Sequence, residues 1–213
     1  MEFVEFAENI RLEFKKELPG ERAQMLMSPL SRATQKQAIK LIPNPTPSAI
    51  LILFYPINNI PHTILMVRNS YDGHHSGQVS FPGGKVEDSD KNLTHTALRE
   101  FEEEMGVDTK KVEILGELSS LIIPPSGFRV SPFVGMLHET IYPKPDKTEV
   151  AETIESSLKY LFDSNNKSLQ TVQSSAKNIK LKAPAYIING NVIWGATAMI
   201  LSELESVCKR FDF

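Results

Sequence analysis

The hydrophobic positions fall into runs that predict strands and helices in different parts of the chain. SAILILFYPI (48–57) and HTILMVRNS (62–70) are nearly continuous in aliphatic and β-branched residues, which predicts two buried strands. Further strands are predicted at 111–123 and 129–139, joined by the turn sequence PPSG, with a short strand at 79–81. The dipeptide Asn189-Gly190 is typical of a two-residue β-hairpin turn.

Other segments have the spacing or the boundary residues of helices, and they lie at 2–18, 29–38, 92–105, 155–163 and 194–211. Pro19-Gly20 ends the first, and Gly106 stands just past the end of the third. Strands surround one central helix and precede a terminal one, which predicts an α/β fold whose mixed sheet has helices on both faces. We expect a helical extension at 1–38 and one main domain at 39–213, with a surface loop at 142–150.

Composition narrows the class of protein. Hydrophobic residues make up 41% of the 213 positions and charged residues 23%, which is typical of a chain with a packed core. The formal charge of −3 argues against a general nucleic-acid binder, which would carry a basic surplus. No apolar run approaches the roughly 20 residues that span a bilayer, and the N-terminus lacks the pattern of a secretory signal. Cys208 is the only cysteine and is expected to be packed; it cannot form an intrachain disulfide, which fits a reducing compartment, and together with the lack of a signal pattern this predicts a cytoplasmic location.

Candidate chemistry concentrates in the predicted helix at 92–105. Glu100, Glu103 and Glu104 stand at positions i, i+3 and i+4, so they share one face of that helix. Like charges on one face repel, and a hard divalent cation such as Mg²⁺, which prefers oxygen ligands, would relieve the repulsion. Without further signals, a solvated acidic face is the ordinary interpretation of such a run. A calcium-binding loop is disfavoured because the acids lie on a helix.

The residues around these glutamates form a longer pattern. It runs Gly84-x5-Asp90-x8-Arg99-Glu100-Phe101-x-Glu103-Glu104-x-Gly106-Val107, and it resembles the Nudix box of hydrolases that act on nucleoside diphosphates linked to another moiety. The resemblance implies an α/β/α sandwich with a mixed sheet, catalytic roles for Arg99, Glu100, Glu103 and Glu104, and Mg²⁺ or Mn²⁺ held by the three glutamates. Asp90 replaces the usual first glutamate, one residue further from Arg99 than is common, and is expected to support the loop.

A second resemblance precedes the box. Residues 64–84, ILMVRNSYDGHHSGQVSFPGG, are similar to the extra motif of the coenzyme A pyrophosphatase branch of the Nudix family. This implies substrate-binding roles for Arg68, Gly77, Gln78, Ser80, Phe81, Gly83 and Gly84. Met66, Asn69 and Gly73 depart from the motif. Gly73 replaces a basic residue, so a contact to the 3′-phosphate of coenzyme A would have to be weaker or come from elsewhere.

Several of these residues keep a purely structural alternative. Arg68 could form a surface ion pair, and Gln78 could cap the loop through its amide. Phe81 could pack in the core rather than stack on a base of the substrate, and Trp194 is expected to be packed. His74 and His75 are poor candidates for ligands because Mg²⁺ prefers oxygen.

The two resemblances together imply a small-molecule substrate, with no nucleic-acid or membrane partner, and are compatible with a homodimer. Water would attack one phosphorus of coenzyme A, or of an acyl-coenzyme A, to give 4′-phosphopantetheine and adenosine 3′,5′-bisphosphate. The base would be one of the helix glutamates, or else Glu149, Glu152 or Glu155. The alternatives are a Nudix hydrolase of ADP-ribose, NADH or a damaged nucleotide, and a catalytically silent Nudix domain that only binds a ligand.

Overall fold

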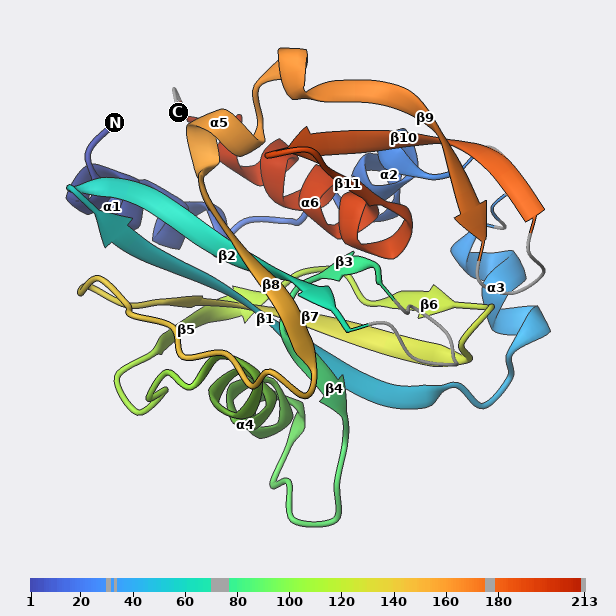
Figure 1. Ribbon diagram of the computed structural model, residues 1–213, viewed down its shortest axis with the longest axis horizontal. Helices are drawn as coiled ribbons and strands as arrows, with labels where there is room; N and C mark the ends of the chain where they lie inside the picture. The colour runs from blue at the N-terminus through green and yellow to red at the C-terminus, as the bar shows by residue number, and fades with distance from the viewer. Residues whose placement is uncertain (30–31, 33, 70–76, 175–178, 212–213) are drawn as a thin grey trace.

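The computed structural model describes residues 1–29, 32, 34–69, 77–174 and 179–211, and its centre is a mixed eight-stranded sheet (Figure 1). β1 (Thr46–Ile57) lies parallel to β7 (Phe128–Met136) and antiparallel to β2 (Ile60–Arg68), which continues the sheet on the other side.

 

β2 also pairs with β8 (Val150–Ser157) and with the short β3 (Val79–Ser80). β4 (Gly83–Lys85) pairs with β1, while β5 (Glu113–Glu117) and β6 (Leu121–Ile123) both pair with β7. All of these other pairings are antiparallel, so the predicted mixed sheet is confirmed.

Helices cover both faces of this sheet. α4 (Leu93–Met105) lies on one face, and α1 (Phe3–Glu13) and α6 (Gly195–Cys208) lie on the other (Figure 1). A second, antiparallel sheet of β9 (Lys167–Ser174), β10 (Ile179–Ile188) and β11 (Asn191–Trp194) packs beyond α6. The short helices are α2 (Gly20–Gln24), η1 (Met25–Met27), α3 (Gln35–Leu41), α5 (Leu158–Leu161) and η2 (Ser164–Asn166).

β1 shows why its sequence is hydrophobic at nearly every position. Ile52 and Phe54 point into the core shared with α1 and α6, whereas Leu51 and Leu53 point into the core under α4. Both faces of the strand are buried, so the alternation of apolar and polar residues that marks a half-exposed strand is absent. Each core holds one face of the sheet against its helices, and together they fix the sheet between α4 and α6.

The N-terminal segment packs on the same molecule rather than standing apart from it. Phe3, Phe6 and Ile10 of α1 are buried in the core that also holds α6. The domain boundary predicted between residues 38 and 39 stays a prediction, but the first helix contributes to the core of the main domain. Among the described residues, no helix is long and apolar enough to cross a membrane.

Several predicted boundaries were correct. α4 ends where Gly106 adopts a left-handed conformation with φ of 65°, and α6 occupies the predicted terminal segment. Asn189 and Gly190 have φ of 50° and 81° and join β10 to β11, which confirms the predicted hairpin.

The first predicted helix, 2–18, is wrong in its length. It ends at Glu13 because the next residues turn so that Phe14 and Leu18 can pack against the core. The helix predicted at 29–38 is displaced to Gln35–Leu41, where Thr34 and Gln37 form a capping box. The helix predicted at 155–163 shrinks to α5.

The strands were also incompletely predicted. The single strand expected at 111–123 is divided into β5 and β6, because the backbone of Ser119 turns to donate to the buried carboxylate of Glu203. β8 and β9 were missed, and Val150, placed in a surface loop, begins β8. Both missed strands are rich in polar residues and are held by pairing with β2 and β10.

Candidate active site

The two glycines that begin β4 bring the backbone close to the carboxylate helix. Gly83 has φ of 152°, and a Cβ at this position would collide with the backbone of Ala49 and Ile50. A Cβ on Gly84 would collide with the carboxylate of Glu100 on α4. Both positions therefore require glycine, the first for its conformation and the close approach to β1, and the second for the close approach to the helix.

Glu104 is a buried carboxylate of α4, with 2% of its side chain exposed. Its Oε2 accepts a hydrogen bond of 2.8 Å from the backbone N–H of Gly83, and its Oε1 lies 3.3 Å from Nη2 of Arg68. Burial raises the pKa of Glu104 to about 8, although the charge of Arg68 and the hydrogen bond from Gly83 act in the opposite direction. The side chain is thus held rigidly in a place that disfavours its negative charge.

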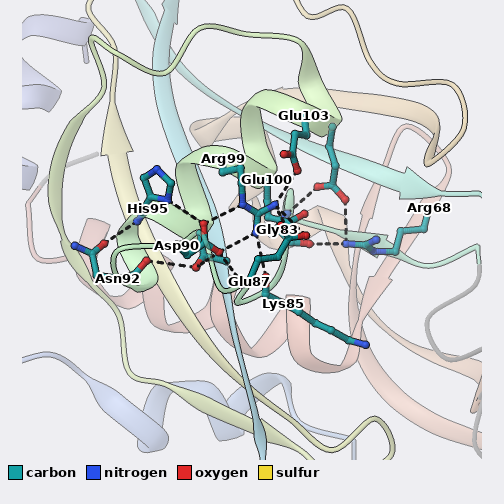
Figure 2. A network of polar contacts seen from close by, with 12 residues as sticks. Arg68, Gly83, Lys85, Glu87, Asp90, Asn92, His95, Arg99, Glu100 and Glu103 are labelled. Carbon is teal, nitrogen blue, oxygen red and sulfur yellow. Dashed lines mark hydrogen bonds and ion pairs between the residues drawn. The ribbon is translucent and has the colours of Figure 1, made fainter.

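Arg99 organises the outer side of the same helix (Figure 2). It binds Asp90 with two hydrogen bonds, 3.0 Å from Nε to Oδ1 and 2.9 Å from Nη2 to Oδ2. Nη1 donates to Glu103 at 2.8 Å and lies 3.1 Å from Glu100, while Nη2 also donates to the backbone oxygen of Lys85 at 3.1 Å. One guanidinium therefore connects the loop to two of the glutamates predicted as ligands.

Asp90 is the anchor of the loop before α4. Its side chain is fully covered, and besides Arg99 it accepts hydrogen bonds from Thr96 and from the backbone N–H of Glu87. The guanidinium of Arg99 holds the pKa of Asp90 well below its usual range. These contacts agree with the supporting role expected for this aspartate.

The three glutamates predicted as metal ligands do not occupy equivalent positions. Glu100 and Glu104 line a cavity, whereas the side chain of Glu103 is 58% exposed and paired with Arg99. Burial also raises the pKa of Glu100. Within the part of the chain that the structure describes, no three acidic, histidine or cysteine side chains are gathered in a ready-made metal site. Instead, Glu100 and Glu103 both pair with Arg99, whereas Glu104 faces Arg68.

The donor set nevertheless fits a hard cation. Glu104 Oε1 is buried without a hydrogen-bond partner, and only the longer ion-pair contact to Arg68 faces it. Glu100 lies one turn away on α4 and is also partly desolvated. The carboxylates of Glu100 and Glu104 therefore both face the cavity, and Glu103 lies next to Glu104 on the helix. Oxygen-rich, partly desolvated groups of this kind suit Mg²⁺ or Mn²⁺.

The cavity beside these residues has a volume of about 770 Å³. Its acidic end is formed by Glu100, Glu104 and Glu149, with Arg68 beside them. Its remaining walls are largely apolar and include Ile50, Phe128, Val130, Trp194 and Ile200. The size and the lining are typical of a site for a ligand of nucleotide size with a few polar anchors.

The other predicted substrate contacts are distributed around this cavity. Arg68, Gln78, Ser80, Phe81, Gly83 and Gly84 all line it, whereas Gly77 lies at the start of the described segment before β3 and is not part of the lining. Arg68 donates to the backbone oxygen of Gly83 at 2.9 Å in addition to facing Glu104. Phe81 is 2% exposed and belongs to the core, so its packing role is confirmed.

Several alternatives named from the sequence can now be separated. Of the three further candidates for the base, Glu149 alone lines the cavity, while Glu155 accepts a hydrogen bond of 2.6 Å from Tyr55 and Glu152 is exposed on β8. Trp194, expected only to be packed, also lines the cavity. Cys208 is buried as expected. Gly73, His74 and His75 lie outside the described residues.

Sequence reasoning missed Arg32, which lines the cavity from the segment before α3. It belongs to no motif, and its neighbours in the sequence give no periodic signal. Only the fold brings it beside β6, where it donates to the backbone oxygen of Ile122 at 2.6 Å.

Comparison with known proteins places this geometry in a family. A model of the NUDIX domain matches residues 46–163. An uncharacterised Nudix hydrolase, NudL, of Pectobacterium atrosepticum is 31% identical over 193 residues, which cover 86% of this chain and 89% of that protein. The mouse mitochondrial coenzyme A diphosphatase NUDT8 is 30% identical over 191 residues, which cover 86% of each chain.

Solved structures show the same fold at low sequence identity. The Nudix hydrolase RenU from M. smegmatis has a TM-score of 0.51 and 15% identity, covering 79% of this chain and 88% of that one. A MutT/nudix family protein from Enterococcus faecalis has a TM-score of 0.50 and 14% identity, covering 78% and 63%. These structures support the α/β architecture.

Proposed function

The chain belongs to the Nudix hydrolase family, and we propose that it cleaves the diphosphate of coenzyme A, and of acyl-coenzyme A, to 4′-phosphopantetheine and adenosine 3′,5′-bisphosphate. The observation that carries this proposal is the position of the motif at 77–84. Its glycines end directly beside the carboxylate helix, where the N–H of Gly83 donates to Glu104. The similarity to a mouse coenzyme A diphosphatase over most of the chain supports the same substrate class.

Glu100, Glu103 and Glu104 would hold Mg²⁺ or Mn²⁺. A bound divalent ion would neutralise charge on the diphosphate oxygens and lower the pKa of a bound water. The protein would supply the positioning. Gly83 and Arg68 fix Glu104, and Arg99 fixes Glu100 and Glu103 against the loop anchored by Asp90.

Water would attack one phosphorus, and the bond from that phosphorus to the bridging oxygen would break. We assign the proton of the attacking water to Glu149, because it lines the cavity together with Glu100 and Glu104. Arg68 stands at this acidic end, so we assign it to the diphosphate that all substrates of the family share.

The N-terminal extension, the homodimer and the cytoplasmic location remain predictions from the sequence.

The substrate is tested by incubating the purified full chain with Mg²⁺ and, separately, coenzyme A, an acyl-coenzyme A, ADP-ribose and NADH, and identifying products by mass. We expect the highest kcat/KM for coenzyme A or its thioester, because that ratio measures discrimination between substrates. A higher ratio for ADP-ribose or NADH would overturn the coenzyme A assignment but not the hydrolase. Binding of a ligand with no turnover of any would favour a silent Nudix domain.

A further inference from the structure

Side chains of both charges line the cavity. Glu100, Glu104 and Glu149 lie at one end. Two cationic side chains, Arg32 and Lys85, also line it, and neither forms an ion pair with any carboxylate of the described ranges. The acidic group suits a metal ion with a bound diphosphate. It does not account for the positive charges of Arg32 and Lys85.

Arg32 is held in place mainly by the protein backbone. Its Nη2 donates to the carbonyl of Ile122 on β6, and the next residue of that strand, Ile123, lines the cavity with its cross-strand partner Phe128. Burial lowers the pKa of Arg32 to about 10, so the guanidinium is still charged at neutral pH. A desolvated cation without a counter-charge is unfavourable, and an anionic ligand group would remove that cost.

Lys85 approaches the same region from the other side. Its Nζ lies 5.5 Å from the centroid of the Phe128 ring, and Figure 2 shows its side chain extending away from the carboxylates. The ring of Phe128 thus has a cation on one side and lies on the strand pair that binds Arg32. Arg32 and the Nζ of Lys85 therefore reach the part of the cavity around Phe128 from two separate segments of the chain.

The sheet register sets the separation of Arg32 from the acidic end. Lys85, Ser48, Val130 and Leu121 form a continuous row across β4, β1, β7 and β6. Three strand spacings amount to about 14 Å. The carbonyl that binds Arg32 belongs to the residue after Leu121, whereas Gly84 beside Glu100 precedes Lys85. A group bound by Arg32 is thus too far away to be either phosphate of a diphosphate held at the glutamates.

We propose that Arg32 binds a phosphomonoester of the substrate that is separate from the diphosphate, carried on the ribose of the nucleoside half. This inference rests on the proposed function and deepens it, because coenzyme A carries such a phosphate on its 3′-oxygen and ADP-ribose and NADH do not. It also assigns a residue of the N-terminal segment, outside the matched domain at 46–163, to substrate selection.

The first test uses the wild-type protein. We expect kcat/KM for coenzyme A to exceed that for 3′-dephospho-coenzyme A by about ten- to a hundredfold, the usual effect of one charged hydrogen bond. Adenosine 3′,5′-bisphosphate should likewise inhibit more strongly than AMP. Equal kcat/KM values for the two substrates would overturn the proposal without the need for any variant.

The second test compares Arg32→Met with Arg129→Met. Arg129 pairs with Ile122 across the strands but does not line the cavity, so its replacement removes the same charge from the neighbouring position. Arg32→Met should lower kcat/KM for coenzyme A by about ten- to a hundredfold and leave the value for 3′-dephospho-coenzyme A within about threefold. Arg129→Met should preserve the wild-type ratio.

Equal losses on both substrates in a folded Arg32→Met variant would mean that Arg32 only ties its segment to β6, and the proposal would fail. If that variant does not fold, Arg32→Lys takes its place. The proposal is contradicted if this variant keeps the wild-type preference for coenzyme A over 3′-dephospho-coenzyme A and the wild-type protein binds adenosine 3′,5′-bisphosphate no better than AMP. Turnover of ADP-ribose with none of coenzyme A would instead overturn the proposed function, and this inference with it.

Discussion

Arg99 and Arg68 both pair with glutamates of α4, but they do so in different surroundings. Arg99 contacts Asp90, Glu100, Glu103 and a backbone oxygen, so most of its donors are used within the protein. Arg68 uses Nη2 for its contacts with Gly83 and Glu104, and it lines the cavity. The difference indicates that Arg99 is a scaffold for the ligands, whereas Arg68 can bind a phosphate without dismantling the loop.

The largest expected effect on activity comes from comparing Glu104, which faces Arg68, with Glu103, which pairs with Arg99. Glu104→Gln should lower kcat on the order of a thousandfold, because it removes the charge of a buried ligand while preserving its volume. Glu103→Gln is the matched control, since Glu103 is exposed and should cost less. Activity at saturating Mg²⁺ and thermal unfolding are measured for both. Near-normal turnover by a folded Glu104→Gln variant would remove Glu104 from the metal site.

Loss of the scaffold arginine should affect stability as well as activity. Arg99→Met leaves the covered carboxylate of Asp90 without its partner, so we expect the free energy of unfolding to fall by about 3 kcal/mol. Activity should fall by a similar factor with coenzyme A and with ADP-ribose, and more Mg²⁺ should be needed. Urea unfolding and a Mg²⁺ titration with both substrates measure these effects. A loss confined to one substrate would contradict a scaffold role.

The contribution of Asp90 to stability should depend on pH. Its pKa is depressed in the folded protein, so the stabilisation is present above the unfolded pKa of about 4 and is lost as the pH falls through the folded value. Asp90→Asn should therefore lower the free energy of unfolding by about 2 kcal/mol at neutral pH, and by less under acid conditions. Urea unfolding of both proteins across this range measures the difference. A difference that is constant with pH would show that the ion pair does not control it.

The site also shows how far the sequence alone reaches. The spacing of Glu100, Glu103 and Glu104 predicts a shared helix face, and Gly106 marks the end of that helix. These are local properties, determined by residues within a turn or two. The spacing does not predict that Glu100 and Glu104 line the cavity while Glu103 is exposed, because side-chain direction depends on competing ion pairs.

Long-range pairing accounts for most of what the sequence did not predict. β1, β2 and the hairpin at Asn189-Gly190 carry strong local signals, and they form as predicted. β8 is polar at several positions and becomes a strand through its pairing with β2. Arg32 depends on the fold in the same way, since only the packing of its segment on β6 brings it to the cavity.

The smallest expected effect concerns Arg68, and it tests where specificity resides. The resemblance at residues 64–84 implies a substrate-binding role for Arg68, and on that basis alone its loss would cost more with coenzyme A than with another diphosphate. Its position beside Gly83 and Glu104 changes that expectation, because every diphosphate substrate would occupy this end of the cavity. Arg68→Met should lower kcat/KM by about tenfold with coenzyme A and ADP-ribose alike, the loss of one modest charged contact.

Both substrates are measured with the same preparations of wild type, Arg68→Met and Arg68→Lys. The lysine variant keeps the charge that faces Glu104 but not the planar fork of the guanidinium, so it should recover part of the activity. A loss at least tenfold greater with coenzyme A than with ADP-ribose would return the specificity role to Arg68 and weaken the assignment of the second phosphate to Arg32. Equal losses on both substrates would leave Arg68 at the diphosphate, opposite the end of the cavity where Arg32 lies.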